Sequence, residues 1–181
     1  MKTFLKIVAV LFVLIIAFAA YEGAFKSASA KETHEGGYTL LGIEHRGAYH
    51  KIGIAFQTLR ENIDKLNLKN VQYAGVYFDD PKTIAEDSLH SMAAVIISNA
   101  NDSAIIAQMT VGGQKMKLHK IAKGNAIVVD TKTWDMFSTM FAAIKAYPAM
   151  AEYAKKHPQK TAPKDFYELH KDGETRFVMQ F

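Results

Sequence analysis

A glutamate and a histidine near the carboxyl end, Glu168 and His170 in the segment Phe-Tyr-Glu-Leu-His, have a spacing that allows joint chemistry. The segment is rich in aromatic and apolar residues and predicts a strand, in which side chains two positions apart point to the same face. A carboxylate and an imidazole on one face can act as a general acid–base couple. The same spacing also fits a pair of solvated side chains, and the sequence leaves both interpretations open.

Other kinds of site receive little support from the residue types. The chain has no cysteine, which excludes disulfide scaffolds, thiolate metal sites and cysteine nucleophiles. Its seven histidines do not follow the spacing of known metal motifs, so we expect no metal ion and no cofactor, and we assign no catalytic residue. The basic residues between Lys115 and Lys123 form a short polar segment, without the aromatic residues that nucleic-acid binders interleave. We therefore expect no nucleic-acid partner.

The composition indicates one folded domain. The 181 residues are 49% hydrophobic and 22% charged, which is too apolar for an intrinsically disordered chain. A chain of this length can bury a substantial core. The net charge of +4 arises partly from Lys2, Lys6 and Lys26 near the amino terminus, so the remaining chain is close to neutral.

The amino-terminal segment is suited to insertion into a membrane. Residues 4–21 provide about eighteen mostly apolar positions, the length of a short membrane-spanning helix, with the Lys6 side chain reaching back to the surface. The same residues also fit a signal peptide that is cleaved after Ala30, or after Ala19 or Ala20. We predict an uncleaved single-pass anchor over residues 1–22, which contacts the lipid bilayer through residues 4–21, and a linker over residues 23–37.

The charges around this segment predict its orientation. Lys2 and Lys6 precede the uncharged stretch from Ile7 to Tyr21, whereas the acidic and basic residues just after it balance one another. Positive charge stays on the cytoplasmic side of a membrane. The domain should therefore be extracytoplasmic, on the periplasmic side if the source is bacterial, and cleavage of a signal peptide would leave it on the same side.

The remaining chain, residues 38–181, shows the order strand, helix, strand, strand twice. Apolar residues at helical spacing indicate one main helix in each half, and short runs of β-branched and aromatic residues indicate the strands. The dipeptide Asp172-Gly173 favours a tight hairpin turn. The expected elements are strands at 38–44, 71–78 and 89–98 with a helix at 50–66, strands at 125–131, 166–170 and 175–181 with a helix at 134–147, and one or two edge strands between 105 and 124.

These elements predict an α+β fold. Two β-α-β-β repeats form a curved antiparallel sheet with both helices on one face, preceded by an N-terminal transmembrane helix, and the other face of the sheet is open or forms a cleft between the halves. Thr133 is expected to cap the second helix, and Pro148 to begin a separate short helix. The side chains expected to pack from the helices toward the sheet are Phe56, Phe137, Phe141, Met136, Met140 and Met150.

Four stretches of the sequence, in order, carry a family resemblance. They are GAYHKIGIAFQTL at 47–59, GVYFDDP at 75–81, YPAMAEYAKKH at 147–157 and FYELH at 166–170. They resemble the GyrI-like small-molecule-binding domain, which also occurs as the effector-binding domain of AraC- and MerR-type regulators. The likeness extends over residues 38–181 and is nearest to the membrane-anchored branch that includes the testis-expressed ER-phagy receptor, in which an apolar anchor also precedes the domain.

The resemblance implies a ligand cleft between the two halves, with a buried carboxylate near its floor. By position in the motif this carboxylate is Glu168, which would recognise a cationic or hydrogen-bond-donating ligand. The aromatic residues expected around it are Tyr49, Tyr77, Trp134 and Tyr147. Aromatic faces beside a carboxylate favour lipophilic cations, so we predict that the domain binds a small apolar or cationic organic molecule.

Two other functions agree with the same sequence. Some members of the family are hydrolases that open cyclopropane-bearing ligands, and Glu168 with Tyr49 or Trp134 would be the corresponding set. A membrane-tethered interaction module, which docks an unknown protein at a sheet edge or at Lys115–Lys123, is the other candidate. A regulator role is not expected, because the sequence shows no helix-turn-helix segment.

Overall fold

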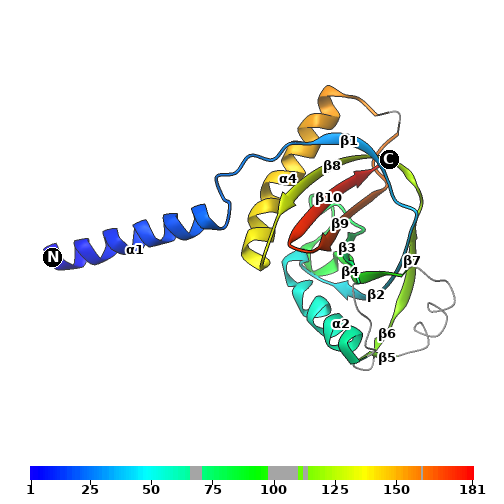
Figure 1. The fold of residues 1–181 in the computed structure, drawn as a ribbon, viewed down its shortest axis with the longest axis horizontal. Coiled ribbons are helices and arrows are strands. Elements are labelled where there is room, and N and C mark those ends of the chain that lie inside the picture. Colours follow the sequence, from blue (N-terminus) through cyan, green and yellow to red (C-terminus); the bar gives the residue numbers. More distant parts are fainter. Residues whose placement is uncertain (66–70, 98–109, 112–113, 160) are drawn as a thin grey trace.

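The computed structural model describes residues 1–65, 71–97, 110–111, 114–159 and 161–181 (Figure 1). The elements are α1 (Lys2–Tyr21), β1 (Lys31–Glu35), β2 (Tyr38–Arg46), α2 (Gly53–Lys65), β3 (Tyr73–Tyr77), β4 (His90–Ile97), β5 (Thr110–Val111), β6 (Gln114–Lys115), β7 (Lys117–Ile121), β8 (Gly124–Lys132), α4 (Met136–Lys156), β9 (Asp165–Lys171) and β10 (Glu174–Gln180). This order contains the two expected β-α-β-β units, β2-α2-β3-β4 and β8-α4-β9-β10.

Eight of the strands form one antiparallel sheet, in the order β1-β8-β10-β9-β3-β4-β2-β7. The sheet curves into a half-barrel, with α2 and α4 packed on the same side of it (Figure 1). The two repeats meet where β9 pairs with β3, and this register places Glu168 opposite Gly75. The predicted α+β fold is confirmed.

Alternating side chains divide the sheet into two packed faces. The inner face encloses one cluster of buried residues from both halves, among them Leu40, Val76 and Tyr167. On the outer face, α2 packs against β2 and β4 through residues such as Leu59, and α4 packs against β8 and β10 through residues such as Met150. The expectation of an open face or cleft opposite the helices is wrong, because the sheet curves around its own side chains there.

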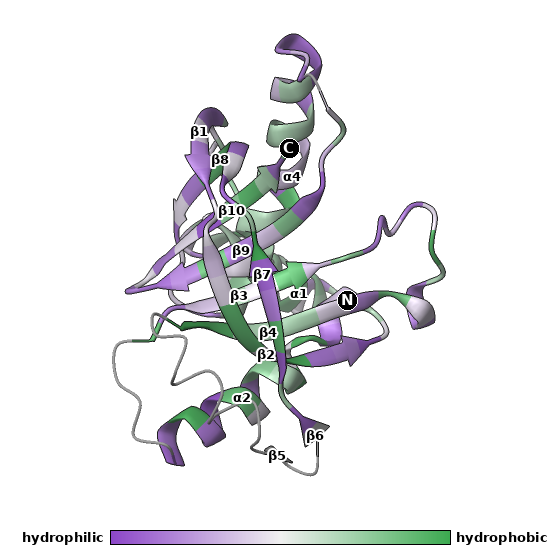
Figure 2. Ribbon diagram, turned by 90° about the vertical axis from the view of Figure 1, so that its right-hand side faces the viewer, coloured by the Kyte–Doolittle hydropathy of each residue, from purple (hydrophilic) through white to green (hydrophobic). Residues whose placement is uncertain are grey.

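The edge strands β1 and β7 are polar, as Figure 2 shows. β1 lies within the segment 23–37 that the sequence predicts to be a linker, and it pairs along its whole length with β8. Its sequence, Lys-Glu-Thr-His-Glu, has no apolar alternation, so periodicity carries no signal for this strand. Backbone pairing holds β1 in place, and its charged side chains discourage pairing with other chains.

Helix α4 is one continuous helix rather than two. Pro148 lies inside it on the exposed side, so the carbonyl group that its missing N–H leaves free can bind water. The N-cap is Asp135 and not Thr133: the side chain of Asp135 accepts a hydrogen bond of 2.8 Å from the Ser138 N–H, and the Ser138 hydroxyl accepts one of 3.0 Å in return. Thr133 is instead buried, with its hydroxyl 2.7 Å from that of Thr175.

The amino-terminal half of α4 buries small side chains rather than large ones. The buried residues of the helix recur every four positions and are Ser138, Ala142, Ala146 and Met150. Burial of Met150 agrees with the prediction, and Phe56 and Phe141 are partly buried. Met136, Phe137 and Met140 are exposed, so the prediction that they pack toward the sheet is wrong. The stripe of α4 that touches the sheet is narrow, and these large residues project beside it.

Helix α1 projects away from the domain, and none of its residues is buried (Figure 1). It is long and apolar enough to cross a membrane. Its carboxyl end contacts the start of α4, where the ring centres of Phe18 and Phe137 lie 5.7 Å apart and those of Tyr21 and Trp134 lie 5.5 Å apart.

Candidate functional site

The seam between the two repeats lies between the two helices. β9 and β3 occupy the middle of the sheet, with α4 over β8 and β10 on one side and α2 over β4 and β2 on the other. Tyr167 and Leu169 of β9 belong to the inner core, so Glu168 and His170 point to the helix side. The prediction that these two side chains share one face is therefore confirmed.

Glu168 is a buried carboxyl group, with 5% of the residue exposed. The Tyr147 hydroxyl of α4 donates a hydrogen bond of 2.8 Å to its Oε1 atom. The His170 Nε2 atom lies 3.5 Å from its Oε2 atom. The Tyr77 hydroxyl of β3 faces the same carboxyl group. Polar groups from both repeats thus converge on one buried acid.

Gly75 leaves the space that the neighbouring rings occupy. A Cβ atom at this position would lie 3.2 Å from the Tyr77 hydroxyl and 3.5 Å from the Phe56 ring. Because Gly75 lies opposite Glu168 on the adjacent strand, a larger residue there would displace the Tyr77 hydroxyl, which faces the carboxyl group.

Aromatic rings from both repeats surround the carboxyl group. The Tyr49 and Tyr77 rings lie 4.9 Å apart at 67°. The Tyr49 hydroxyl donates to the Asp79 carbonyl at 2.8 Å, so it holds the loop after β3 and leaves only its ring beside Tyr77. From α2, the Phe56 ring lies 5.7 Å from the His170 ring, edge to face.

Burial controls the protonation of the group. Burial raises the pKa of Glu168 to about 7, although hydrogen bonds from Tyr147 and Tyr77 pull it down. Burial and the charge of Glu168 raise the pKa of both tyrosines, so their hydroxyls stay protonated and remain donors. Burial, together with the positive charge of Arg60, lowers the pKa of His170 to about 4. His170 is therefore neutral at neutral pH and does not balance a charge on Glu168.

A chain of polar contacts that sequence analysis missed extends from His170. Its Nδ1 atom lies 3.0 Å from the Thr175 hydroxyl, which lies 2.7 Å from that of Thr133. The position of Thr175 beside His170 could have been predicted from the hairpin turn at Asp172-Gly173. Asp172 and Gly173 both adopt positive φ, 50° and 78°, as a two-residue turn requires, and such a turn places residue 175 opposite residue 170.

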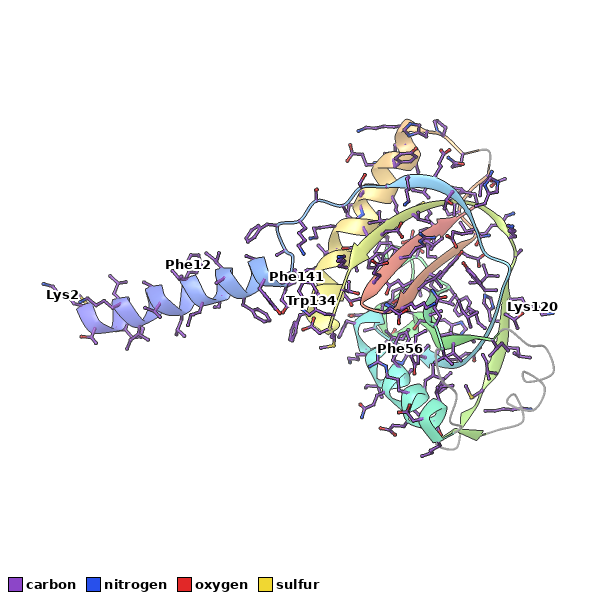
Figure 3. All side chains as sticks on the ribbon, in the orientation of Figure 1. Lys2, Phe12, Phe56, Lys120, Trp134 and Phe141 are labelled. Atoms are coloured by element: carbon purple, nitrogen blue, oxygen red, sulfur yellow. The ribbon has the colours of Figure 1, made fainter. Side chains whose placement is uncertain are left out.

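Trp134 lies apart from the residues around Glu168. It is 46% exposed and precedes α4 at the end nearest α1 (Figure 3). Its ring packs against Tyr21, and the Lys26 Nζ atom lies 5.3 Å from its centre. The structure thus brings together four of the predicted site residues, Glu168, Tyr147, Tyr77 and the ring of Tyr49, and places Trp134 elsewhere.

No metal centre is seen among the described residues, and a small cavity near the start of α4 does not include Glu168. Within the described ranges, no cluster of three or more histidine, aspartate or glutamate side chains is arranged to hold a metal ion. A cavity of about 20 Å³, lined by residues such as Glu22, Lys26 and Lys145, lies between the segment after α1, β8 and α4 and does not include Glu168. The partly exposed tyrosine rings themselves cover the carboxyl group, so a ligand would have to part them.

The arrangement can do two kinds of chemistry. A carboxyl group that ionises near pH 7 among aromatic faces can recognise a cation or a hydrogen-bond donor. The same group beside a neutral imidazole can also transfer a proton.

One family model matches most of the domain. The GyrI-like small molecule binding domain matches residues 32–147, a range that includes Tyr49, Tyr77, Trp134 and Tyr147 and ends before Glu168. No curated protein gives a significant match to the chain.

Solved structures share the fold at low identity. An integron cassette protein from the mobile metagenome of Vibrio cholerae is 12% identical, with a TM-score of 0.59 over 85% of this chain and 97% of that chain. EcmrR in its complex with DNA is 9% identical, with a TM-score of 0.57 over 99% of this chain and 67% of that chain. The C-terminal domain of EcmrR is 10% identical, with a TM-score of 0.51 over 84% of this chain and 96% of that chain.

Proposed function

Because this chain belongs to the family of GyrI-like small-molecule-binding domains, we propose that it binds a small apolar or cationic organic molecule in the seam between its two repeats. The observation that carries the proposal is the buried Glu168 carboxyl group. Among the described residues its ion-pairing neighbour is His170, which is neutral at neutral pH. A buried carboxylate is unfavourable unless a cation or several donors compensate for lost water, and a cationic ligand would supply that compensation.

The rings around Glu168 suit the body of such a ligand. Tyr147 comes from α4, Tyr77 from β3 and Phe56 from α2, so a molecule placed over the carboxyl group would contact both repeats. Aromatic faces attract cations by about 0.5–2 kcal/mol, and most strongly where water is excluded. A ligand with one positive charge and an aromatic or apolar body fits these features best.

Calorimetry with two ions of nearly equal shape tests the proposal. The full chain in detergent is titrated at pH 8 with tetraphenylphosphonium and with tetraphenylborate, whose charge is opposite. We expect saturable binding of the phosphonium and weak or no binding of the borate. Preference for the borate, or no difference between the two ions, would contradict recognition by a carboxylate.

A matched pair of variants assigns the effect to Glu168. Glu168→Gln should weaken phosphonium binding about 10- to 100-fold, since the attraction between unit charges about 6–10 Å apart is roughly 1.5–3 kcal/mol at an effective dielectric constant near 20. Glu174→Gln removes an exposed glutamate from the adjacent strand β10 and should leave affinity unchanged. Unchanged affinity in a folded Glu168→Gln variant would remove Glu168 from the site.

The pKa of Glu168 near 7 also favours a second candidate, hydrolysis of a strained cyclopropane-bearing ligand. A carboxylate can take a proton from the water that attacks a cyclopropane carbon. The ring C–C bond then breaks, its electron pair passes to the dienone oxygen, and that oxygen takes up the proton, which gives an alcohol and a phenol. Chromatography of a spirocyclopropyl dienone incubated with the chain tests this candidate. A hydrated, ring-opened product that Glu168→Gln does not form would support hydrolysis, whereas binding without turnover would support the binding role.

We further propose that residues 4–21 anchor the domain in a membrane and that the domain is extracytoplasmic. The exposed, apolar α1 and the lysines at its start, Lys2 and Lys6, support this orientation. The full chain should remain with membranes after alkaline carbonate extraction and be cleaved by protease added on the extracytoplasmic side. A shortened, released chain would instead indicate a signal peptide.

A further inference from the structure

A group of large apolar side chains is exposed where α4 begins. They are Trp134 (46%), Met136 (70%), Phe137 (46%), Met140 (47%) and Ile144 (62%), and we call them the α4 patch. The buried stripe of α4 consists of other residues, so packing against the sheet does not account for them. A contiguous apolar surface of this kind on a folded domain marks an interaction surface.

The α4 patch is continuous with the end of α1. The ring of Phe18, in the last turn of α1, makes a T-shaped contact with the ring of Phe137. Tyr21, the last residue of α1, packs against Trp134. The side-chain view shows α1 meeting the domain at this end of α4 (Figure 3). If α1 spans a bilayer, these contacts place the patch at the level where the chain leaves the hydrocarbon.

The residue types at this junction identify a lipid surface as the occupant. Tyrosine and tryptophan, with amphipathic rings, are enriched at membrane–water interfaces, and Tyr21 and Trp134 meet here. Lys26 lies over the Trp134 ring and has a side chain long enough to reach headgroups. The methionine and isoleucine side chains of the patch suit the boundary with the acyl chains.

A stripe of α4 joins the patch to the Glu168 site. Met140 follows Met136 by four positions, and Tyr147 follows Met140 by seven, so the three side chains lie along one side of the helix. Met136 and Met140 belong to the patch, and the Tyr147 hydroxyl bonds to Glu168. A molecule lying along this side of α4 would contact the bilayer surface at one end and the buried carboxyl group at the other.

We propose that the α4 patch rests in the surface of the bilayer that α1 enters, and that the Glu168 site takes amphiphilic cations from that bilayer. The inference rests on the anchoring and binding roles proposed above. It adds the route of entry: the cation would reach the Glu168 site from the bilayer surface beside the α4 patch rather than from the surrounding water.

The single tryptophan of the chain makes the position of the patch measurable. The full chain is reconstituted in phosphatidylcholine vesicles that carry a nitroxide either at the headgroup or deep in the acyl chain. We expect the headgroup probe to quench Trp134 emission at least twofold more than the deep probe. In the control Trp134→Phe/Tyr153→Trp, which moves the tryptophan to the far end of α4, neither probe should quench. Unquenched Trp134 in the unmodified chain would overturn the proposal.

Charged substitutions in the patch provide the second measurement. Phe137→Glu/Ile144→Glu changes two exposed side chains of the patch that lie outside the stripe of Met136, Met140 and Tyr147. It should reduce Trp134 quenching several-fold, and it should weaken tetraphenylphosphonium binding in vesicles but not in detergent. Ile84→Glu, at an exposed apolar residue outside the patch, should change neither. Full quenching in the double variant would overturn the assignment of the patch.

These experiments distinguish failure of the proposed binding function from failure of the proposed membrane contact. If the unmodified chain does not bind tetraphenylphosphonium in detergent, the binding role and the ligand class fail together. The quenching result still decides whether the α4 patch contacts the bilayer.

Discussion

Two buried glutamates of this domain, Glu35 and Glu168, differ in their partners: Glu35 pairs with a cationic side chain, whereas Glu168 contacts neutral groups. Glu35 is 7% exposed, pairs with Arg176 and accepts a hydrogen bond of 2.6 Å from the Tyr38 hydroxyl. Arg176 also donates two hydrogen bonds, of 2.6 and 3.1 Å, to Asp130. Glu168 is buried to the same degree, but the groups that contact it are hydroxyls and a neutral imidazole.

The difference separates a structural cluster from a candidate site. Although burial opposes it, hydrogen bonds and charge from Arg176 and Lys31 hold the pKa of Asp130 below its usual range. In the cluster of Glu35, Asp130 and Arg176, the protein itself thus supplies the positive charge that balances the carboxylates. Burial instead raises the pKa of Glu168 to about 7, and the group remains a weak acid whose charge an outside cation can balance.

Removal of the built-in cation should have the largest effect. Arg176→Met would leave Glu35 and Asp130 without their guanidinium partner, so we expect the free energy of unfolding to fall by about 3 kcal/mol. Urea denaturation at pH 7 measures the change. Lys132→Met removes an exposed lysine at the end of β8 and should stay within about 0.5 kcal/mol of the unmodified chain. If Arg176→Met is as stable as the unmodified chain, Arg176 does not stabilise Glu35 and Asp130, and the contrast with Glu168 fails.

Glu168→Gln should act with the opposite sign and raise the free energy of unfolding by about 2 kcal/mol at pH 8. The folded pKa near 7 exceeds the unfolded value of 4.5, so ionisation of Glu168 opposes folding increasingly from pH 4.5 to pH 7 and fully above pH 7. The variant should match the unmodified chain near pH 4.5.

Urea denaturation at several pH values isolates this contribution. His170, whose pKa is lowered to about 4, destabilises the fold as pH falls from 6.5 toward 4, in both chains alike. Subtraction of the two curves removes that effect. A Glu168→Gln variant that is less stable at pH 8 would indicate that the carboxylate is compensated within the protein.

The affinity for a cation should follow the ionisation of Glu168. Tetraphenylphosphonium binding should strengthen about tenfold between pH 6 and pH 8 and level off above that, because the ionised fraction of an acid with a pKa near 7 rises about tenfold over this range. Calorimetry at each pH provides the measurement, and Glu168→Gln should give a flat profile. A steep profile in the variant would assign the titration to another group.

Trp134→Phe should have the smallest effect on ligand binding. Trp134 contacts Tyr21 and Lys26 rather than Glu168, so we expect the detergent affinity for tetraphenylphosphonium to change less than about twofold. The same calorimetry applies. A tenfold loss of affinity would indicate that Trp134 contacts the ligand, as the sequence analysis predicted.

Local rules predicted the parts of the site that lie close together in the chain. A two-residue spacing in a strand placed Glu168 and His170 on one face, and Asp172-Gly173 predicted the hairpin that joins β9 to β10. The same rules failed where packing with distant segments decides. Helical spacing predicted burial of Phe137, but Phe137 is exposed. The residues of α4 that are buried against the sheet form a different stripe, from Ser138 to Met150.

The sequence by itself determined the two β-α-β-β repeats, the apolar amino-terminal helix and the shared face of Glu168 and His170, because periodicity and turn chemistry act over a few residues. Only the tertiary structure decided which aromatic residues meet Glu168, and that β1 is a strand. Tyr77 and Tyr147 reach Glu168 because β3 pairs with β9 and α4 crosses the sheet, and these contacts join segments far apart in the chain. The burial that raises the pKa of Glu168 arises from that assembly and cannot be read from its neighbours in sequence.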